Sequence, residues 1–393
     1  MLPYYLLLLL VAVLGFVLCE RRGSRRNDLI YLCVVTAVMI LMASLRADTV
    51  GIDYKMYANY FQSVANHDLS YLISAENPYR IEFGFSLLNY LVSLVTNHTY
   101  VFMAVVAVLT IGLRAVAIYR YSSSAWISVF TFVAFGFFGY TMCTLRQEIA
   151  ISILLFAIPL LQKKKLVPYT LLVLLAASFH KSVLILIPIY FLANLPVNWK
   201  SLVIYGAGTG LILIFSWPII NFVTKFVYQF YIETEQGRYY LMGRDAKTAL
   251  IPIVVFIAAY CLKKRLLNRN PQNVVLLNFT MYAAFLFILT IKHFIFQRVA
   301  LIFFPAIIYL LPEIVCSVQV DPEKTEELTL LQQADRGRRK QTSAKETKLR
   351  TELRDQKALY YAAIGFVLAV GLLYYAFLLQ TNRLLLVPYV TLF

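Results

Sequence analysis

The chain has 393 residues, of which 61% are hydrophobic and only 14% are charged, and its formal net charge is +16. Ordinary soluble domains carry roughly a quarter charged residues, so this composition excludes a typical soluble protein and favours a polytopic membrane protein. The Lys and Arg residues form short clusters between apolar runs, which argues against a nucleic-acid-binding face, and the five widely spaced cysteines predict neither a disulfide framework nor a zinc site.

The first apolar run, residues 4–19, is followed at once by the basic segment "ERRGSRR". No basic residue precedes the run and no small-residue cleavage site follows it, which is unlike a signal peptide. Because Lys and Arg favour the cytoplasmic side of a membrane, we predict an uncleaved helix whose N-terminus faces outside.

Apolar runs suited to membrane spans recur along the chain, and the positive-inside rule decides how they alternate. About twelve spans place the clusters "QKKK" and "KKRLLNRN" in the cytoplasm and return the C-terminus to the outside. The predicted spans cover residues 4–19, 29–45, 100–118, 126–141, 148–161, 167–179, 182–194, 201–219, 248–262, 274–291, 298–315 and 359–378.

An outer loop is predicted for residues 46–99, which follow the second span. Within this loop the segment 83–96, "FGFSLLNYLVSLVT", is short for a span and is polar at Asn89. Counting it as a span would also move every later basic loop to the outside. We therefore predict an interfacial or re-entrant helix there.

The polar stretch "SFHKS", which begins at Ser178, interrupts the apolar segment 167–194. A single helix would bring His180 and Lys181 near mid-membrane and would place "KKRLLNRN" outside. We therefore predict two short helices joined by an outward-facing turn. Each half is only about 13 residues, or roughly 20 Å, so the turn is expected to lie below the outer surface in protein or in a wet cavity.

Two further loops complete a single integral membrane domain over residues 1–393. Residues 220–247 are predicted as an outer loop rich in aromatic and polar side chains. Residues 316–357 are predicted as a charged cytoplasmic loop, in which both charge signs alternate at helix-like spacing. A solvated, partly helical linker is the favoured interpretation of that loop, and a partner-binding element is the alternative.

Ionisable side chains near a membrane are costly, so they tend to be functional or tightly paired. In the predicted topology they gather at the outer ends of the spans. Five segments could form one site: "TVGIDYKMYANYF", "YRIEFGFSLLNY", "CTLRQEIA", "SFHKS" and "GRYYLMGRDAK", with "FQRVA" opening a later span. These segments supply the candidates Asp53, Tyr54, Tyr57, Glu82, Asn89, Arg146, Gln147, His180, Lys181, Arg238, Arg244 and Arg298.

Each candidate also has a simpler explanation. An arginine such as Arg146 or Arg298 can anchor a helix at the interface with its stem in the apolar layer. Asp53 and Glu82 can serve only to pair with those arginines, and His180 can bond a backbone carbonyl at a helix end. The pair of glutamates in "YIETEQ" is weak evidence for a divalent cation, and a solvated loop is favoured there.

The chemistry that fits these residues is a substrate that carries phosphate and a lipid tail. The planar guanidinium of arginine matches phosphate oxygens, and several cations in one cavity stabilise a diphosphate leaving group. A histidine or carboxylate can take the proton of an attacking hydroxyl. Aromatic rings and amide side chains suit sugar faces and hydroxyls.

The same segments resemble the EpsG family. The likeness rests on "TVGIDYKMYANYF" from Thr49, "EFGFSLLNYLVS" from Glu82, "LRQEIAISILLFAI" from Leu145 and "SFHKSVLILIPIYF" from Ser178, in that order. Beyond about residue 195 it thins to "GRYY" and "QRVALIFFPAI". Ile52 departs from the family pattern, in which a small or polar residue before the Asp is more familiar, and the charged loop after residue 316 is longer than usual.

Members of that family are Wzy-like polymerases of bacterial exopolysaccharide, capsule and O-antigen. The resemblance implies an all-helical, GT-C-like bundle in the cytoplasmic (inner) membrane, with a metal-independent site on the outer or periplasmic face and no cofactor. The implied reaction moves a growing chain from undecaprenyl diphosphate to the hydroxyl of an incoming lipid-linked repeat. Membrane lipid, a chain-length regulator and a flippase are the other implied partners, and nucleic acid is not one.

Within this hypothesis Arg146, Arg238 and Arg298 bind the diphosphate, with help from Lys181 and Arg244, and either His180 or Asp53 is the general base. His180 is slightly preferred because an ordinary imidazole is half deprotonated near pH 6.5, whereas Asp53 would need its pKa raised by burial. The remaining candidates would contact the sugar or the charged residues: Tyr54, Tyr57, Glu82, Asn89 and Gln147.

Three other functions stay open at the level of the sequence. An O-antigen ligase would use the same donor with a different acceptor. A flippase or transporter of lipid-linked sugars would be expected to show internal repeats and polar residues leading to both faces, and neither is visible. A non-catalytic membrane scaffold would tolerate loss of the outer arginines.

Overall fold

The computed structural model describes residues 1–21, 23–74, 77–79, 81–227, 246–319, 322–335 and 344–392. Within these ranges the chain is almost entirely helical and forms no β-strand, which confirms the all-α prediction. The helices of the N-terminal half are α1 (Leu2–Leu14) with its π-helical extension Gly15–Glu20, α2 (Arg25–Ser44), α3 (Tyr54–Ala65), α4 (Phe83–Ser93), α5 (Thr99–Tyr121), α6 (Ala125–Ala134), α7 (Phe137–Thr141), α8 (Leu145–Gln162) and α9 (Leu166–Ala177).

The second half of the chain continues the helical pattern and ends in an extended tail. Its helices are α10 (Leu186–Leu192), α11 (Trp199–Ile214), α12 (Ser216–Val227), α15 (Leu250–Cys261), α16 (Lys263–Arg269), α17 (Val274–Leu289), α18 (Phe296–Phe303), α19 (Ile307–Ser317), α20 (Pro322–Asp335) and α21 (Ala344–Thr381). Short 3-10 segments lie at Leu69–Ile73, Lys181–Ile185, Lys247–Ala249, Pro271–Asn273 and Phe304–Ala306.

Many of these helices are apolar enough to cross a membrane. Within the described ranges, seven helices have both the length and the hydropathy of a span, and several apolar helices are shorter. Every predicted span falls on a helix or on consecutive helices, but the number of crossings and the GT-C-like arrangement stay predictions. The chain is therefore an all-helical membrane protein.

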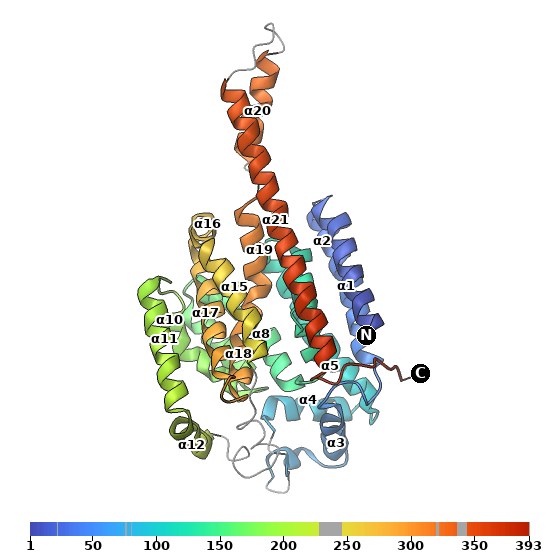
Figure 1. Ribbon diagram of the computed structural model, residues 1–393. Helices are drawn as coiled ribbons and strands as arrows, with labels where there is room; N and C mark the ends of the chain where they lie inside the picture. Colours follow the sequence, from blue (N-terminus) through green and yellow to red (C-terminus); the bar gives the residue numbers. More distant parts are fainter. Residues whose placement is uncertain are drawn as a thin grey trace.

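The helices form one bundle whose two ends differ in character (Figure 1). Helices α8 and α17 and the α18–α19 segment are largely buried in its interior, whereas α1, α2 and α21 expose most of their surface. Figure 1 places α16 and α20 toward one end and α3, α4 and α12 at the other. We call the end that holds α3 and α4 the loop end.

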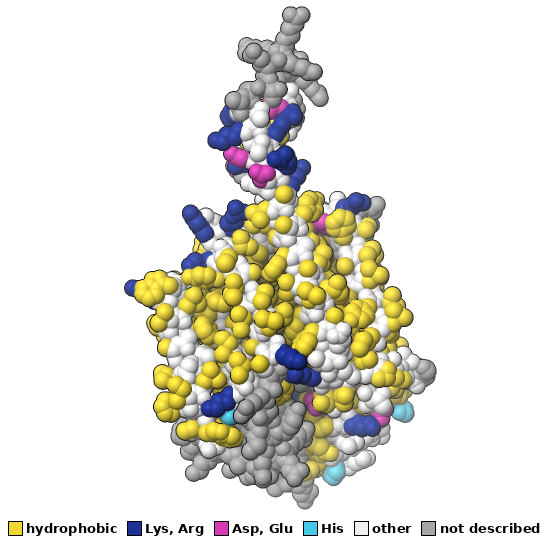
Figure 2. Space-filling model, viewed as in Figure 1, with side chains coloured by type: hydrophobic (Ala, Val, Ile, Leu, Met, Phe, Trp, Pro, Cys, Tyr) yellow, Lys and Arg dark blue, Asp and Glu magenta, His cyan; other side chains and the backbone are white. Residues whose placement is uncertain are grey.

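The surface of the bundle matches this division (Figure 2). On the face shown, hydrophobic side chains form a broad band, and Lys and Arg are prominent above it near α16 and along α20 and α21. Exposed apolar residues such as Leu6, Leu41 and Leu373 would be costly in water but favourable against lipid tails. The basic segment "KKRLLNR" of α16 thus lies opposite the loop end, as the predicted topology requires.

The polar stretch at Ser178 is a turn between two helices that run back along each other. Helix α9 ends at Ala177, and the next helical segment begins at Lys181. Tyr169 donates a hydrogen bond to the carbonyl of Leu186 at 2.7 Å, and Tyr190 donates one to the carbonyl of Lys164 at 2.6 Å. Such antiparallel pairing shows that residues 167–194 are a helical hairpin rather than one long helix.

The predicted span over residues 126–141 is interrupted by a glycine. Residues 126–141 form two helices, α6 and α7, because Gly136 adopts φ 82°, a left-handed conformation that favours glycine. A Cβ atom at Gly136 would lie 2.4 Å from Cδ1 of Leu378, so glycine also permits the close approach of α21.

The charged segment predicted as a loop is largely helical in its described part. Helix α21 begins at Ala344 and continues into the apolar span that ends at Thr381. Helix α20 packs against it, with Lys324 bonded to Glu352 at 2.6 Å and Lys345 bonded to Glu327 at 2.8 Å. Figure 1 shows this pair of helices projecting beyond the bundle.

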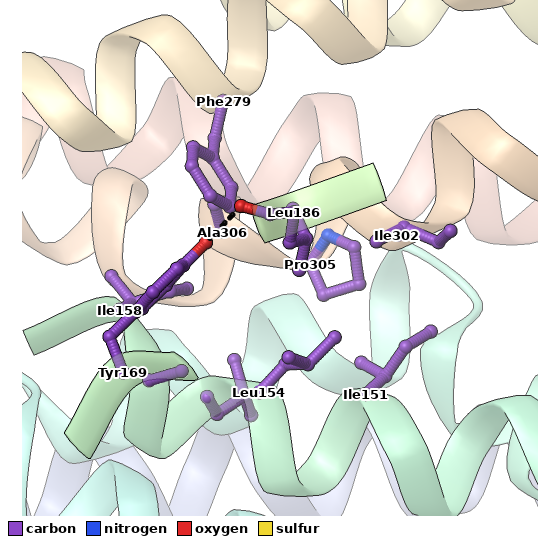
Figure 3. Close-up of a pocket in the computed structure, with 11 residues that line it drawn as sticks. Ile151, Leu154, Ile158, Tyr169, Leu186, Phe279, Ile302, Pro305 and Ala306 are labelled. Atoms are coloured by element: carbon purple, nitrogen blue, oxygen red, sulfur yellow. Dashed lines mark hydrogen bonds between the residues drawn. The ribbon is translucent and has the colours of Figure 1, made fainter. Parts of the chain in front are cut away.

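The interior of the bundle is packed mainly with apolar side chains. A cavity of only about 10 Å³ lies between α8, α9, α17 and α18. Figure 3 shows its lining residues beside the hydrogen bond from Tyr169 to Leu186. A space of this size holds about one water molecule. It is too small for a sugar or a diphosphate.

A buried ion pair crosses this apolar interior. Arg114 of α5 bonds to the carboxylate of Glu148 in α8, and their side chains are only 1% and 2% exposed. The guanidinium carbon of Arg114 also lies 5.1 Å from the ring centre of Phe132. Because neither charge can be left alone in an apolar interior, the pair holds α5 and α8 in one register.

We predict that replacing Arg114 by Met lowers the free energy of unfolding by about 3–5 kcal/mol, because Glu148 is left as an uncompensated buried charge. Unfolding of the purified protein in mixed detergent micelles measures this change. The Arg114→Met/Glu148→Leu double variant is the matched control and should recover most of the loss, because an apolar pair can replace a buried ion pair. A single variant as stable as the wild type would contradict this role.

Candidate functional site

Several predicted site residues meet at the loop end of the bundle. They come from α3, from the start of α4, from the first turn of α8 and from the turn between α9 and the segment Lys181–Ile185. These elements are far apart in the sequence, so only the fold brings them together.

The carboxylate of Glu82 is the hub of this region. Its Oε2 accepts a hydrogen bond from Nη1 of Arg146 at 2.5 Å. Its Oε1 accepts the backbone N–H of Lys181 at 3.2 Å and lies 3.7 Å from Nδ1 of His180. Burial alone would raise the pKa of Glu82, but the charge of Arg146, the nearby His180 and the backbone hydrogen bonds hold it below its ordinary value. Glu82 is therefore ionised and joins α4, α8 and the turn.

A close backbone approach fixes the start of α4 on the same turn. The N–H of Gly84 donates to the carbonyl of Ser178 at 2.8 Å. A Cβ atom at Gly84 would lie 2.4 Å from Oγ and 2.7 Å from the carbonyl oxygen of Ser178. Only glycine fits at this position without displacing α4.

His180 lies in the turn, outside both flanking helices, and its side chain is almost fully buried. Neither ring nitrogen has a hydrogen-bond partner among the described residues, although Nδ1 faces Glu82. Burial lowers the pKa of His180 from 6.5 to about 4, and the charge of Glu82 only partly opposes this shift. The imidazole is therefore neutral at pH 7 and a weaker base than the ordinary histidine that the sequence led us to expect.

Asp53 begins α3 directly after a specialised loop. Gly51 adopts φ 103°, a left-handed conformation that favours glycine, and a Cβ atom there would lie 2.5 Å from the carbonyl oxygen of Met142. Burial raises the pKa of Asp53, and the charges of Arg298 and Arg146 oppose this rise without cancelling it. The two arginines therefore lie close enough to Asp53 to influence its ionisation.

A cavity of about 360 Å³ opens beside Asp53 at the loop end. Three predicted residues line it: Asp53, Gln147 and Arg298. Gln147 donates from its amide to the carbonyl of Arg298 at 3.0 Å, which ties the first turn of α8 to α18. A volume of this order suits a sugar ring or a diphosphate, unlike the small cavity in the bundle interior.

The cavity has polar lining residues that sequence reasoning missed. Gln297 donates to the hydroxyl of Tyr140 at 3.3 Å, and both side chains line the cavity. Arg383, which follows α21, also lines it. Both residues could have been found from the sequence. Gln297 lies in the segment "FQRVA" beside the candidate Arg298, and Arg383 is the charged residue that follows the last apolar run.

Other predicted contact residues lie inside the protein rather than on the cavity. The ring of Tyr54 lies 5.2 Å from the guanidinium carbon of Arg46, a buried arginine that also bonds to backbone carbonyls. Tyr57 packs edge-on against Phe85. Asn89 is fully buried and donates to the carbonyl of Phe85 at 2.7 Å. These three side chains support the arrangement of α3 and α4.

Lys181 is exposed at the turn, where its backbone contacts Glu82. Arg238 and Arg244 lie outside the described residues, as does most of the predicted outer loop 220–247. Within the described ranges, no three His, Cys, Asp or Glu residues group as a metal site would require.

Comparison with known proteins yields one match. The model of the EpsG family matches residues 29–328 of this chain. No curated protein and no solved structure matches it.

We predict that Gly84→Ala separates α4 from the turn and weakens the contacts of Glu82 with Arg146 and Lys181. The expected result is a folded membrane protein whose activity falls at least about tenfold, because misplacing a group by about 1 Å is costly. Gly112→Ala is the matched control: a Cβ atom at Gly112 meets nothing within 4 Å, so this change should leave activity unchanged. Equal activity of the two variants would contradict the tight docking of α4.

We also predict a pH dependence that comes from His180. Its pKa is about 4 in the folded protein and close to the ordinary 6.5 when unfolded, so the unfolded chain binds more protons between these values. The contribution of the buried neutral imidazole to stability is complete above pH 6.5 and is lost as the pH falls toward 4. Denaturant unfolding of the wild type and of His180→Asn across this range measures it. The variant should lose less stability on acidification, and parallel curves would refute the prediction.

Proposed function

This chain belongs to the EpsG family, and on that premise we propose that it is a polymerase of lipid-linked oligosaccharide repeats. The donor is a growing saccharide on undecaprenyl diphosphate, and the acceptor is a hydroxyl of an incoming lipid-linked repeat. The product belongs to the exopolysaccharide, capsule or O-antigen class. The observation that carries this proposal is the cavity that places Asp53 and Arg298 together at one end of an apolar bundle.

The proposed reaction is a single glycosyl transfer. The acceptor hydroxyl attacks the anomeric carbon of the donor sugar as the bond between that carbon and the diphosphate oxygen breaks. The diphosphate leaves with the bonding electron pair, so negative charge develops on its oxygens. Arg298, which lines the cavity, and Arg146, whose charge acts on Asp53, are the residues that we propose stabilise this negative charge.

Asp53 is the better supported general base. It lines the cavity, and burial raises its pKa, which makes the carboxylate a stronger base than an exposed aspartate. Binding of a diphosphate would offset the charge of Arg298, which otherwise lowers the pKa of Asp53, so the base would strengthen as the donor binds. His180 does not line the cavity, and burial lowers its pKa, so its imidazole is a weaker base than that of an ordinary histidine. We therefore propose that Asp53 takes the proton of the acceptor hydroxyl and that His180 helps to position the neighbouring residues. This assignment reverses the preference drawn from the sequence.

The remaining candidates keep narrower proposed roles. Gln147, together with Gln297 and Tyr140, offers amide and hydroxyl groups that suit sugar hydroxyls. Lys181, Arg238 and Arg244 stay proposed diphosphate ligands on sequence grounds. Glu82 positions Arg146, whereas Tyr54, Tyr57 and Asn89 shape the walls behind the site.

The site is proposed to face the outside of the bacterial cytoplasmic membrane. The basic segment of α16 lies opposite the loop end, and Lys and Arg residues concentrate on the cytoplasmic side of membrane proteins. The same one-sided arrangement favours a polymerase over a flippase, because a transporter needs polar groups that lead to both faces.

We predict that Asp53→Asn and Arg298→Gln each abolish long polymer while single repeats persist. Loss of a general base costs about 100-fold to 10,000-fold in rate, enough to remove the ladder of chain lengths. Electrophoresis of saccharide from a host strain that carries only the variant gene measures the outcome, with membrane levels of the protein checked in parallel.

Asp48→Asn is the matched control. Asp48 precedes α3 in the same loop, and its exposed side chain lies 3.9 Å from Lys55 rather than in the cavity. This variant should give a normal ladder. Normal ladders from Asp53→Asn and Arg298→Gln would refute the placement of the site, and complete loss of sugar from the acceptor would indicate a ligase.

A further inference from the structure

The described residues after α21 form a strap across the loop end. We call residues 382–392 the C-terminal strap. It runs antiparallel to residues 45–52 and pairs with them through backbone hydrogen bonds, including Ala47 N–H to the carbonyl of Val390 at 2.8 Å and Gly51 N–H to that of Leu385 at 2.9 Å. Further bonds run from Ile52 N–H to Leu384 at 3.0 Å and from Leu392 N–H to Leu45 at 2.9 Å. The strap is thus attached along its length to the loop that precedes Asp53.

The first turn of the strap has an unusual backbone. Asn382 and Leu385 adopt φ 45° and 51°, and such a conformation is costly for leucine in particular. The side chain of Asn382 holds the turn by donating to the carbonyl of Val387 at 2.6 Å and accepting its N–H at 2.9 Å. Strained conformations persist where the surrounding structure over-determines them, and they cluster at functional sites.

This turn brings Arg383 to the cavity. Arg383, Leu384 and Leu386 of the strap line the cavity that Asp53 and Arg298 also line. Arg383 is exposed, so the cavity is open to the surface beside it. The strap lies beyond residue 328, where the family match ends.

The charges around the cavity favour an anion that carries more than one negative charge. Of the described residues that line it, Arg298 and Arg383 are the cations and Asp53 is the carboxylate. Two guanidinium groups on separate elements, α18 and the strap, suit the two phosphates of a diphosphate. The apolar residues Phe377 and Leu378 line the same cavity, so its wall also suits the first part of a lipid tail.

We propose that Arg383 binds the diphosphate of the lipid-linked donor together with Arg298, and that the C-terminal strap is therefore a wall of the active site. This inference rests on the proposed function and adds a binding residue to it. The ligand is a diphosphate that is attached to a lipid, in preference to a free phosphate, because cations and apolar residues line one cavity.

Binding of undecaprenyl diphosphate to the purified full-length protein in lipid nanodiscs tests this proposal. We expect saturable binding to the wild type, no comparable binding of undecaprenol, and much weaker binding of inorganic pyrophosphate. Arg383→Gln should weaken binding of undecaprenyl diphosphate at least about tenfold, and Arg383→Lys should weaken it less because it keeps the charge without the planar fork.

Two controls separate loss of binding from loss of structure. Each variant should unfold at the same temperature as the wild type, and Arg383→Lys supplies the comparison if Arg383→Gln does not fold. Arg120→Gln removes an exposed arginine at the end of α5 and should leave binding unchanged.

The outcomes distinguish this inference from the proposed function. Wild-type affinity in a folded Arg383→Gln variant, with binding lost in Arg298→Gln, would overturn the role of Arg383 and leave the proposed function standing. Equal affinity for pyrophosphate and undecaprenyl diphosphate would overturn the lipid-linked ligand. Failure of the wild type to bind either diphosphate would overturn both proposals.

Discussion

One buried carboxylate, that of Glu82, organises the loop end of this protein. It contacts Arg146 of α8, the backbone of Lys181 and the ring of His180, so it joins the start of α4 both to α8 and to the turn. An ion pair formed away from bulk water is weakly screened, which makes its geometry demanding. The contact of Gly84 with Ser178 also restricts the geometry, because a Cβ atom at Gly84 would clash with Ser178.

The cavity depends on this framework but is completed by other parts of the chain. Asp53 enters it from the loop before α3, Gln147 from α8, and Arg298 from α18. The C-terminal strap closes the arrangement by pairing with the loop before Asp53. Residues from both ends of the chain therefore share one wall, so the site requires the complete bundle rather than a separable domain.

Charged side chains occur in two different settings in this protein. Arg114 and Glu148 neutralise each other in the interior, where both side chains are almost fully buried. Asp53, Arg298 and Arg383 instead border a cavity of about 360 Å³. A closed, buried ion pair is typical of a structural contact, whereas charged groups that border a cavity indicate a candidate site.

The sequence by itself determined the all-helical membrane character, the family resemblance and several of the residues at the loop end. It also located the break at Ser178, because the cost of charge in hydrocarbon and the placement of basic loops are properties of composition and order. The sequence did not reveal that Glu148 forms an ion pair inside the bundle, whereas its neighbours Arg146 and Gln147 lie at the loop end. It did not reveal that the ring of Tyr54 packs against the guanidinium of Arg46.

Only the tertiary structure decided which charges are paired, which border a cavity and how burial shifts their pKa values. The fold lowers the pKa of His180 and raises that of Asp53, and of these two residues only Asp53 lines the cavity. It also brings Arg383 to the cavity that Asp53 lines, although more than half of the chain separates them in sequence. Desolvation and distance depend on neighbours from remote segments, and local patterns of residue type do not contain that information.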